Sequence, residues 1–217
     1  YSGSSKLRRW AALMALRIFF TTIIGLIIVL TQAFASDHFE DGLHFVTLSK
    51  PVVTADPNKI EVMELFWYGC SHCDDLEPGL KAWVKQLPSD VSFVRMPVVF
   101  GRSWEMHARM FWVAKNLKLL DSIHEPLFNA LHRHNKKLQN ESQVVEFFAQ
   151  FGADPLQVRK ELKSFATESA LRLADARTRS YGIRGVPALV VNGKYVTGVA
   201  QAGGEKHLFK LLDYLIK

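Results

Sequence analysis

The sequence contains very little cysteine, with only Cys70 and Cys73 among its 217 residues. So few thiols exclude a small domain held together by several disulfides, because that class is rich in cysteine. The pair forms the tetrapeptide Cys70-Ser71-His72-Cys73, directly after the apolar run of residues 60–68. Since no other cysteine is available for a cross-link, this C-x-x-C spacing favours thiol chemistry over a structural role.

The sequence also lacks internal repeats and low-complexity stretches. Its 48% hydrophobic and 22% charged residues are typical of a globular protein, which excludes global disorder. Residues 36–217 are numerous enough to bury a core without disulfides. They suit one compact domain, or one fold that carries an inserted subdomain.

Acidic residues are absent from positions 1–35, where four basic residues precede an uncharged run from Ile18 to Ala35. The run ends in Ala33-Phe34-Ala35, an A-x-A cleavage pattern. This layout predicts a secretory signal peptide over residues 1–35, and therefore export to an oxidising compartment. The alternative is an uncleaved membrane anchor, because the 18 uncharged residues approach the length that spans a bilayer.

A strong excess of basic charge is absent once this segment is set aside. The whole chain carries a net charge of +6, from 27 basic and 21 acidic residues. Without the four basic residues of the first segment, 23 basic residues face 21 acidic ones, a net charge of +2. Nucleic-acid binding needs a clustered basic face, which this composition does not support.

Strand signals lie at the two ends of residues 36–217. Alternating or continuous apolar runs predict strands over residues 43–48, 60–68 and 91–96. Near the C-terminus, Asn192-Gly193 lies between two short apolar runs and predicts a β-hairpin.

Helical signals fill most of the remainder. A helix is expected from the C-x-x-C to about Leu87, with a kink at Pro78. Residues 103–150 show helical periodicity only, and Asp154-Pro155 starts a helix that could run to Tyr181. A closing helix is expected near the C-terminus.

The order of these elements predicts the fold class. A β-α-β unit followed by a β-β-α unit, with helices inserted between them, indicates an α/β, thioredoxin-like fold with an inserted all-helical subdomain. The thioredoxin-like domain then occupies residues 36–102 and 166–217, and the helical insertion occupies residues 103–165.

A C-x-x-C at the start of a helix has a chemical consequence. Cys70 would lie beside unpaired backbone N–H groups and the positive end of the helix dipole, which lower the pKa of a thiol. Cys73 lies one turn later and can close the disulfide, while His72 can donate to the Cys70 thiolate. The structural alternatives are a static bridge, or half of a zinc site completed by His132 and His134. That histidine pair lies in a polar segment, which favours a solvated surface instead.

These features together resemble the DsbA family of periplasmic thiol oxidases. The resemblance runs from about Phe39 to the end of the chain and rests on two stretches, Glu64 to Cys73 and Arg184 to Tyr195. One departure is Ser71, because the best-known members have proline between the first cysteine and the histidine. That dipeptide tunes the redox potential, so the departure bears on oxidising strength.

The resemblance implies roles for further residues. Val186-Pro187 matches the family's cis-proline loop, which faces the disulfide and pairs with a bound substrate peptide. Glu64 matches a buried acid beneath the active site that could accept or relay the Cys73 proton, and Arg95 takes the place of its basic partner. The alternative is a purely structural ion pair between Glu64 and Arg95. Glu77 is expected to be a solvated helix acid.

The predicted function is that of a periplasmic thiol:disulfide oxidoreductase that donates its disulfide to newly exported, unfolded proteins with free thiols. The predicted site residues are catalytic Cys70, Cys73, His72 and Glu64, and substrate-binding Val186 and Pro187. No dissociable cofactor or metal is expected, and the chain is expected to be a monomer. The resemblance implies reoxidation by a DsbB-like, quinone-linked membrane partner. The alternatives are a reductase or isomerase of the same fold, or a membrane-tethered binding or chaperone module with a static disulfide.

Overall fold

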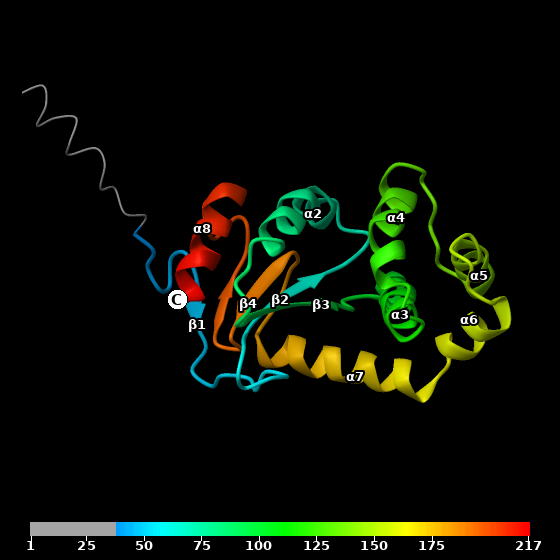
Figure 1. The fold of residues 1–217 in the computed structure, drawn as a ribbon, viewed down its shortest axis with the longest axis horizontal. Coiled ribbons are helices and arrows are strands. Elements are labelled where there is room, and N and C mark those ends of the chain that lie inside the picture. The colour runs from blue at the N-terminus through cyan, green and yellow to red at the C-terminus, as the bar shows by residue number, and fades with distance from the viewer. Residues whose placement is uncertain (1–37) are drawn as a thin grey trace, which may run out of the picture. The chain divides into compact units, whose positions relative to one another are not determined.

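The computed structural model describes residues 38–217, so the predicted signal segment 1–35 lies outside the described residues. Five strands form one mixed sheet in the order β1-β5-β4-β2-β3 (Figure 1). Strand β2 is an interior strand, since it pairs in parallel with β3 and antiparallel with β4. The strands are β1 (Val46–Thr47), β2 (Ile60–Phe66), β3 (Val91–Pro97), β4 (Ala188–Val191) and β5 (Tyr195–Thr197).

Helices cover both faces of this sheet and extend beyond it. Helices α2 and α8 lie over one face, α7 lies under the other, and α3 to α6 gather to one side (Figure 1). The helices are α2 (Ser71–Val84), α3 (Arg102–Asn116), α4 (Leu120–His132), α5 (Glu141–Ala149), α6 (Pro155–Leu162), α7 (Phe165–Ser180) and α8 (Glu205–Leu215). Within residues 38–217, none of them has the length and apolar character needed to cross a membrane.

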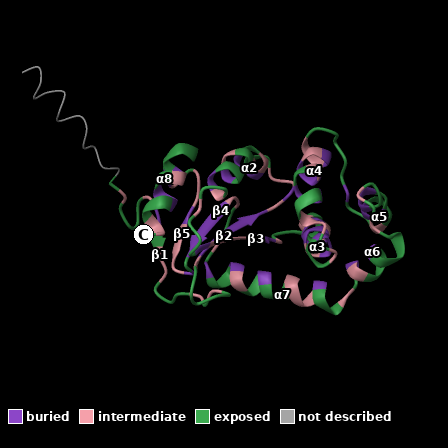
Figure 2. Ribbon diagram, viewed as in Figure 1, coloured by how far each residue is buried: buried purple, intermediate pink, exposed green. Residues whose placement is uncertain are grey.

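The interior strand β2 is buried almost throughout, as the purple ribbon in Figure 2 shows. Alternation sends Val62 into the cluster formed with α2 and α8, whereas Met63 and Leu65 enter the cluster that contains Ala174 of α7. Because side chains alternate, Glu64 lies on the same side as Val62, toward α2. The alternation of side chains along β2 therefore places the Glu64 carboxyl group in the apolar layer between the sheet and α2.

The third apolar cluster joins the helical block to the end of β2. Phe66, Tyr68 and Cys73 pack there with Phe111 of α3 and Phe128 of α4. The helices of residues 102–162 therefore share a core with the segment that carries the C-x-x-C.

Several predicted element boundaries were wrong. The helix expected from Pro155 to Tyr181 is two helices, because the Ser164 hydroxyl accepts a hydrogen bond from the Thr167 N–H at 3.1 Å and starts a new helix. The first predicted strand shrinks from residues 43–48 to Val46–Thr47. Helix α2 continues through Pro78 and ends at Val84, short of the predicted Leu87.

Candidate active site

The C-x-x-C lies where the chain leaves β2 and enters α2. Cys70 is the N-cap residue of α2, with extended backbone angles, and it is half-buried. Cys73 lies one turn into the helix and is completely buried. Both cysteines are free thiols in this structure. The Cys73 N–H donates to the Cys70 carbonyl at 3.2 Å, so the two residues belong to the same first turn.

The two thiols differ strongly in acidity. A hydrogen bond with the Cys73 thiol lowers the pKa of Cys70 from 9.0 to about 6, although burial opposes the change. Backbone N–H groups of Cys73 and His72 and the charge of His72 lower this pKa further. The bond to Cys70, followed by burial, raises the pKa of Cys73 far above its usual range. At neutral pH the pair is therefore a Cys70 thiolate held by a protonated Cys73.

The His72 ring points into solvent. Its side chain is 82% exposed and lies 3.9 Å from the Asp75 carboxylate. Among the described residues no hydrogen bond joins this ring to Cys70, so the expected donation from the ring is absent here. What His72 supplies is its backbone N–H and its positive charge when protonated.

The Val186-Pro187 segment faces the thiols. The peptide bond between these two residues is cis, and the Val186 carbonyl oxygen lies 3.5 Å from Cys70 Sγ, which can donate to it only while Cys70 is protonated. A cleft of about 850 Å³ opens beside them and is lined mostly by apolar groups, including Leu48, Leu76, Val186, Pro187 and Val199. A surface of this kind, next to a reactive sulfur, suits an extended apolar peptide.

Glu64 lies in the sheet beneath α2 and has no exposed surface. Its partner in the β2–β3 register is Arg95, whose Nε donates to Glu64 Oε2 at 3.0 Å. Burial, followed by the Glu77 charge, raises the pKa of Glu64 to about 8, although Arg95 partly offsets the rise. The residue is thus a neutral acid over most of the range near pH 7, which does not fit a permanently ionised structural pair.

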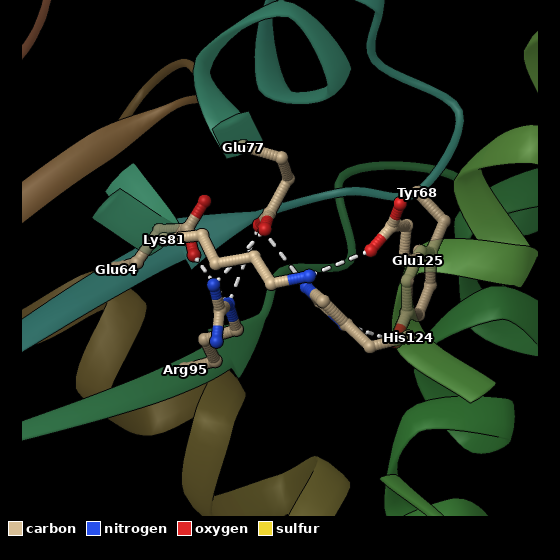
Figure 3. Close-up of polar contacts among 7 residues, drawn as sticks. All are labelled: Glu64, Tyr68, Glu77, Lys81, Arg95, His124 and Glu125. Atoms are coloured by element: carbon tan, nitrogen blue, oxygen red, sulfur yellow. Dashed lines mark hydrogen bonds and ion pairs between the residues drawn. The ribbon is translucent and has the colours of Figure 1, made fainter. Parts of the chain in front are cut away.

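Glu77 was expected to be solvated, and this expectation was wrong. Its side chain is only 15% exposed, because Arg95 and His124 both contact it (Figure 3). Arg95 Nη2 lies 3.0 Å from Glu77 Oε2, and His124 Nε2 lies 3.0 Å from Glu77 Oε1. Burial disfavours the charge of Glu77, but the His124 hydrogen bond and the neighbouring cations outweigh it and lower its pKa.

The series of polar contacts that begins at Glu64 ends at Tyr68. His124 Nδ1 lies 2.7 Å from the Tyr68 hydroxyl, so Glu64, Arg95, Glu77, His124 and Tyr68 form one connected polar network (Figure 3). Burial lowers the pKa of His124 even though Glu77 acts in the opposite direction. The described residues contain no group of three or more His, Cys, Asp or Glu side chains arranged to hold a metal ion.

Comparison with known proteins agrees with this geometry. The family profile described as a DSBA-like thioredoxin domain matches residues 80–215. The chain is 38% identical over 197 residues to a protein named thiol:disulfide interchange protein DsbA from Pseudomonas aeruginosa, covering 91% of this chain and 93% of that one. A DsbA of Azotobacter vinelandii is 40% identical over 176 residues, which is 81% of this chain and 82% of the relative.

The chain belongs to the DsbA-like thioredoxin family.

Solved structures of this family share the fold. The crystal structure of Pseudomonas aeruginosa DsbA has a TM-score of 0.80 and 40% identity, over 83% of this chain and 94% of that chain. The oxidoreductase DsbA of Xylella fastidiosa has a TM-score of 0.74 and 28% identity, over 79% and 92% of the two chains. The predicted thioredoxin-like fold class is confirmed, and so is the predicted activity of a thiol:disulfide oxidoreductase.

Sequence reasoning missed His124 altogether. The residue lies on the apolar side of α4, with Ile123, Leu127 and Phe128, and is only 8% exposed. A single polar residue within such an apolar stripe was the available signal, but it could not identify Tyr68 and Glu77 as the partners.

Proposed function

We propose that this DsbA-family protein is a dithiol oxidase that transfers its Cys70–Cys73 disulfide to thiols of newly exported, unfolded proteins. The observation that supports this direction is the acidity of Cys70, whose pKa is lowered to about 6. A thiolate that is stabilised in the reduced form makes the corresponding disulfide a stronger oxidant. The reduced enzyme is then the favoured product of exchange.

The reaction proceeds in two exchange steps. A substrate thiolate attacks Cys70 Sγ, which forms a mixed disulfide and releases Cys73 as the leaving group. A second substrate thiolate then attacks the substrate sulfur of that mixed disulfide and expels the Cys70 thiolate. Two electrons pass from the substrate dithiol to the enzyme, and the substrate gains one disulfide.

In this proposal Glu64 moves the proton that Cys73 needs. The leaving Cys73 thiolate is buried and must be neutralised, because its pKa lies far above the usual range. Glu64 lies close enough for its charge to raise that pKa, and its own pKa of about 8 keeps a proton available near neutrality. Positioning by Arg95 would orient the Glu64 carboxyl group without forcing it to ionise.

The peptide substrate would lie across Val186 and Pro187. The Val186 carbonyl already meets Cys70, and the adjoining cleft provides apolar surface without strong chemical selectivity. The proposed cellular setting is the periplasm, reached through the signal segment of residues 1–35. A DsbB-like quinone-linked partner would reoxidise the enzyme, which would act as a monomer.

The test is the equilibrium of the Cys70–Cys73 bond with glutathione. DsbA proteins that oxidise have potentials of about −120 mV, whereas the reductant thioredoxin lies at about −270 mV. We expect this protein to lie nearer the first value. A potential near the second value would contradict the oxidase and favour the reductase of the same fold.

A further inference from the structure

Three histidines of the helical block contact the two residues that follow β2. Trp67 Nε1 donates to His107 Nδ1 at 3.1 Å, and the Tyr68 hydroxyl lies 2.7 Å from His124 Nδ1. His132 Nε2 lies 2.8 Å from the carbonyl oxygen of Tyr68. His107 comes from α3, whereas His124 and His132 come from α4. We call these three side chains the histidine clamp.

The contacts of His107 determine its protonation. Nδ1 accepts from the Trp67 indole, so the ring proton must be on Nε2, which donates to the Lys137 carbonyl at 2.9 Å. Both ring nitrogens are then used, and burial keeps the ring neutral by lowering its pKa. The ring is therefore fixed in position and in tautomer.

The ring of His124 is fixed in the same way, and the ring of His132 is held through one nitrogen. Glu77 is ionised and can only accept, so His124 Nε2 donates to it and leaves Nδ1 to accept from the Tyr68 hydroxyl. A carbonyl oxygen can only accept, so His132 Nε2 donates to Tyr68. The clamp thus holds the side chain of Trp67 and both the side chain and backbone of Tyr68.

The clamped residues contact both cysteines. The Trp67 carbonyl accepts the Cys70 N–H at 2.9 Å, closing the turn that presents Cys70. A hydrogen bond from the Trp67 backbone acts on Cys73, where it favours the thiolate. Any shift of residue 67 would therefore change the surroundings of both sulfurs.

Packing leaves the Trp67 indole little freedom. Its ring stacks on Trp104 of α3, with ring centroids 4.0 Å apart and planes 6° from parallel. The indole also lies so close to Gly69 that a Cβ at residue 69 would collide with the ring. The residue before Cys70 must be glycine because Trp67 is held by α3.

We propose that His107, His124 and His132 are positioning residues for disulfide exchange, through which the helical block fixes the Trp67–Tyr68 turn and sets the reactivity of Cys70 and Cys73. None of the three touches the reacting sulfurs, so they act through residues 67 and 68. The proposal holds for exchange in either direction and does not depend on the oxidase assignment.

The test separates this role from ordinary packing. A substitution that destabilises the oxidised and reduced forms equally leaves the redox equilibrium unchanged, whereas a change of turn geometry acts differently on a thiolate and a disulfide. We therefore choose the glutathione equilibrium constant, and the pH profile of Cys70 alkylation, as readouts. Denaturant melts of both redox forms accompany them.

Two substitutions each remove a clamp contact and leave all side-chain contacts to Glu64 and Glu77 in place. His107→Leu removes the contact to Trp67, and Tyr68→Phe removes one hydroxyl but keeps the ring that packs on Phe66 and Phe128. We expect each to shift the glutathione equilibrium by about tenfold toward a weaker oxidant, equivalent to about 30 mV. The pH profile of Cys70 alkylation should move to higher pH, because the turn that positions the Cys70 thiolate is no longer held in place.

His107→Gln is the rescue variant, since an amide retains one acceptor and one donor. It should recover most of the wild-type equilibrium. His134→Leu is the matched control, because His134 lies just beyond α4 and is exposed. The proposal is overturned if His107→Leu and Tyr68→Phe lower stability but leave the equilibrium within about twofold of wild type, a shift of less than about 10 mV. It is also overturned if His134→Leu shifts the equilibrium as much as they do.

Discussion

Helix α2 separates two clefts of different chemistry. On one side, the cleft of about 850 Å³ beside Val186 and Pro187 is mostly apolar. On the other, a cavity of about 530 Å³ between α2 and α4 is lined largely by charged groups, among them Glu77, Lys81 and Arg95. Helix α2 thus has a mostly apolar surface that suits a peptide on one side and a cavity lined by charged, titratable side chains on the other.

This difference follows from what each side packs against. The apolar side of α2 meets the segment around the cis-proline and β5, whereas the charged side meets α4 of the helical block. In the mechanism that we propose, substrate contact and control of protons lie on separate surfaces. Substitutions on one side should affect binding, and those on the other should affect stability and rate.

The largest effect is expected from Arg95→Met on the charged side. Arg95 contacts both Glu64 and Glu77, so its loss leaves two poorly exposed carboxyl groups without their shared cation. We expect the free energy of unfolding to fall by about 3 kcal/mol in a urea melt. Lys81→Met is the control, because Lys81 and Glu125 are both well exposed, and its melt should scarcely change. Equal losses in the two variants would contradict the difference between buried and surface charge.

Glu64→Gln tests the proton role of the same network. If Glu64 protonates the leaving Cys73, the formation of mixed disulfides should slow by about 100-fold in stopped-flow turnover, while Cys70 alkylation keeps its pH profile. A variant with unchanged turnover would remove Glu64 from the mechanism.

The stability of Glu64→Gln should depend on pH in a different way from that of the wild type. The folded pKa of Glu64 is raised from 4.5 to about 8, so its stabilising contribution is present below pH 4.5 and is lost as the pH rises through about 8. Glu64→Gln should lack this loss, so its free energy of unfolding should rise relative to that of the wild type as the pH rises from 4.5 to about 8. A pH-independent difference would show that Glu64 is ionised throughout.

Ala200→Glu sharpens the comparison from the apolar side. Ala200 is exposed and lines the cleft, so a carboxylate there should disturb peptide contact without altering the core. We expect the KM for an unfolded dithiol peptide to rise about fourfold, the change that corresponds to the free energy of burying one methylene group. The glutathione equilibrium should stay unchanged. Ala200→Leu is the matched variant and should not raise the KM. A shifted redox equilibrium in Ala200→Glu would mean that the two sides are not separate.

The last test concerns the effect of pH on the thiolate itself. The pKa of Cys70 is lowered from 9.0 to about 6 in the folded protein, so its contribution to stability is present above pH 9 and is lost as the pH falls through about 6. The reduced protein should therefore lose stability relative to Cys70→Ser between pH 8 and pH 5. Parallel melts of the two proteins would instead indicate an ordinary thiol.

Local features of the site could be predicted from the sequence because they need only neighbouring residues. The C-x-x-C at a helix start places Cys70 at the N-cap and Cys73 one turn inside. The apolar run before it predicts β2, and strand alternation puts Glu64 on one face with Val62. The role of Val186-Pro187 was accessible only through the family resemblance, because the two segments are far apart in the chain.

The surroundings of these residues were not predictable in the same way. Glu77 was expected to be solvated, since its neighbours on α2 include polar residues, but α4 covers it with His124. The three clamp contacts join residues separated by 40, 56 and 64 positions. No periodicity or short motif encodes a contact at such a separation.

The sequence by itself determined the fold class, the reacting thiols and their order along the helix, because strand period, helix caps and C-x-x-C spacing act over a few residues. Only the tertiary structure decided how acidic the carboxyl groups of Glu64 and Glu77 are, whereas the acidity of Cys70 depends mainly on its neighbours Cys73 and His72. Acidity depends on burial and on charges brought from distant segments, such as Arg95 beside Glu64 and His124 beside Glu77. The position of the reacting thiols therefore follows from neighbouring residues, whereas the protonation of the carboxyl groups near them depends on how distant segments pack.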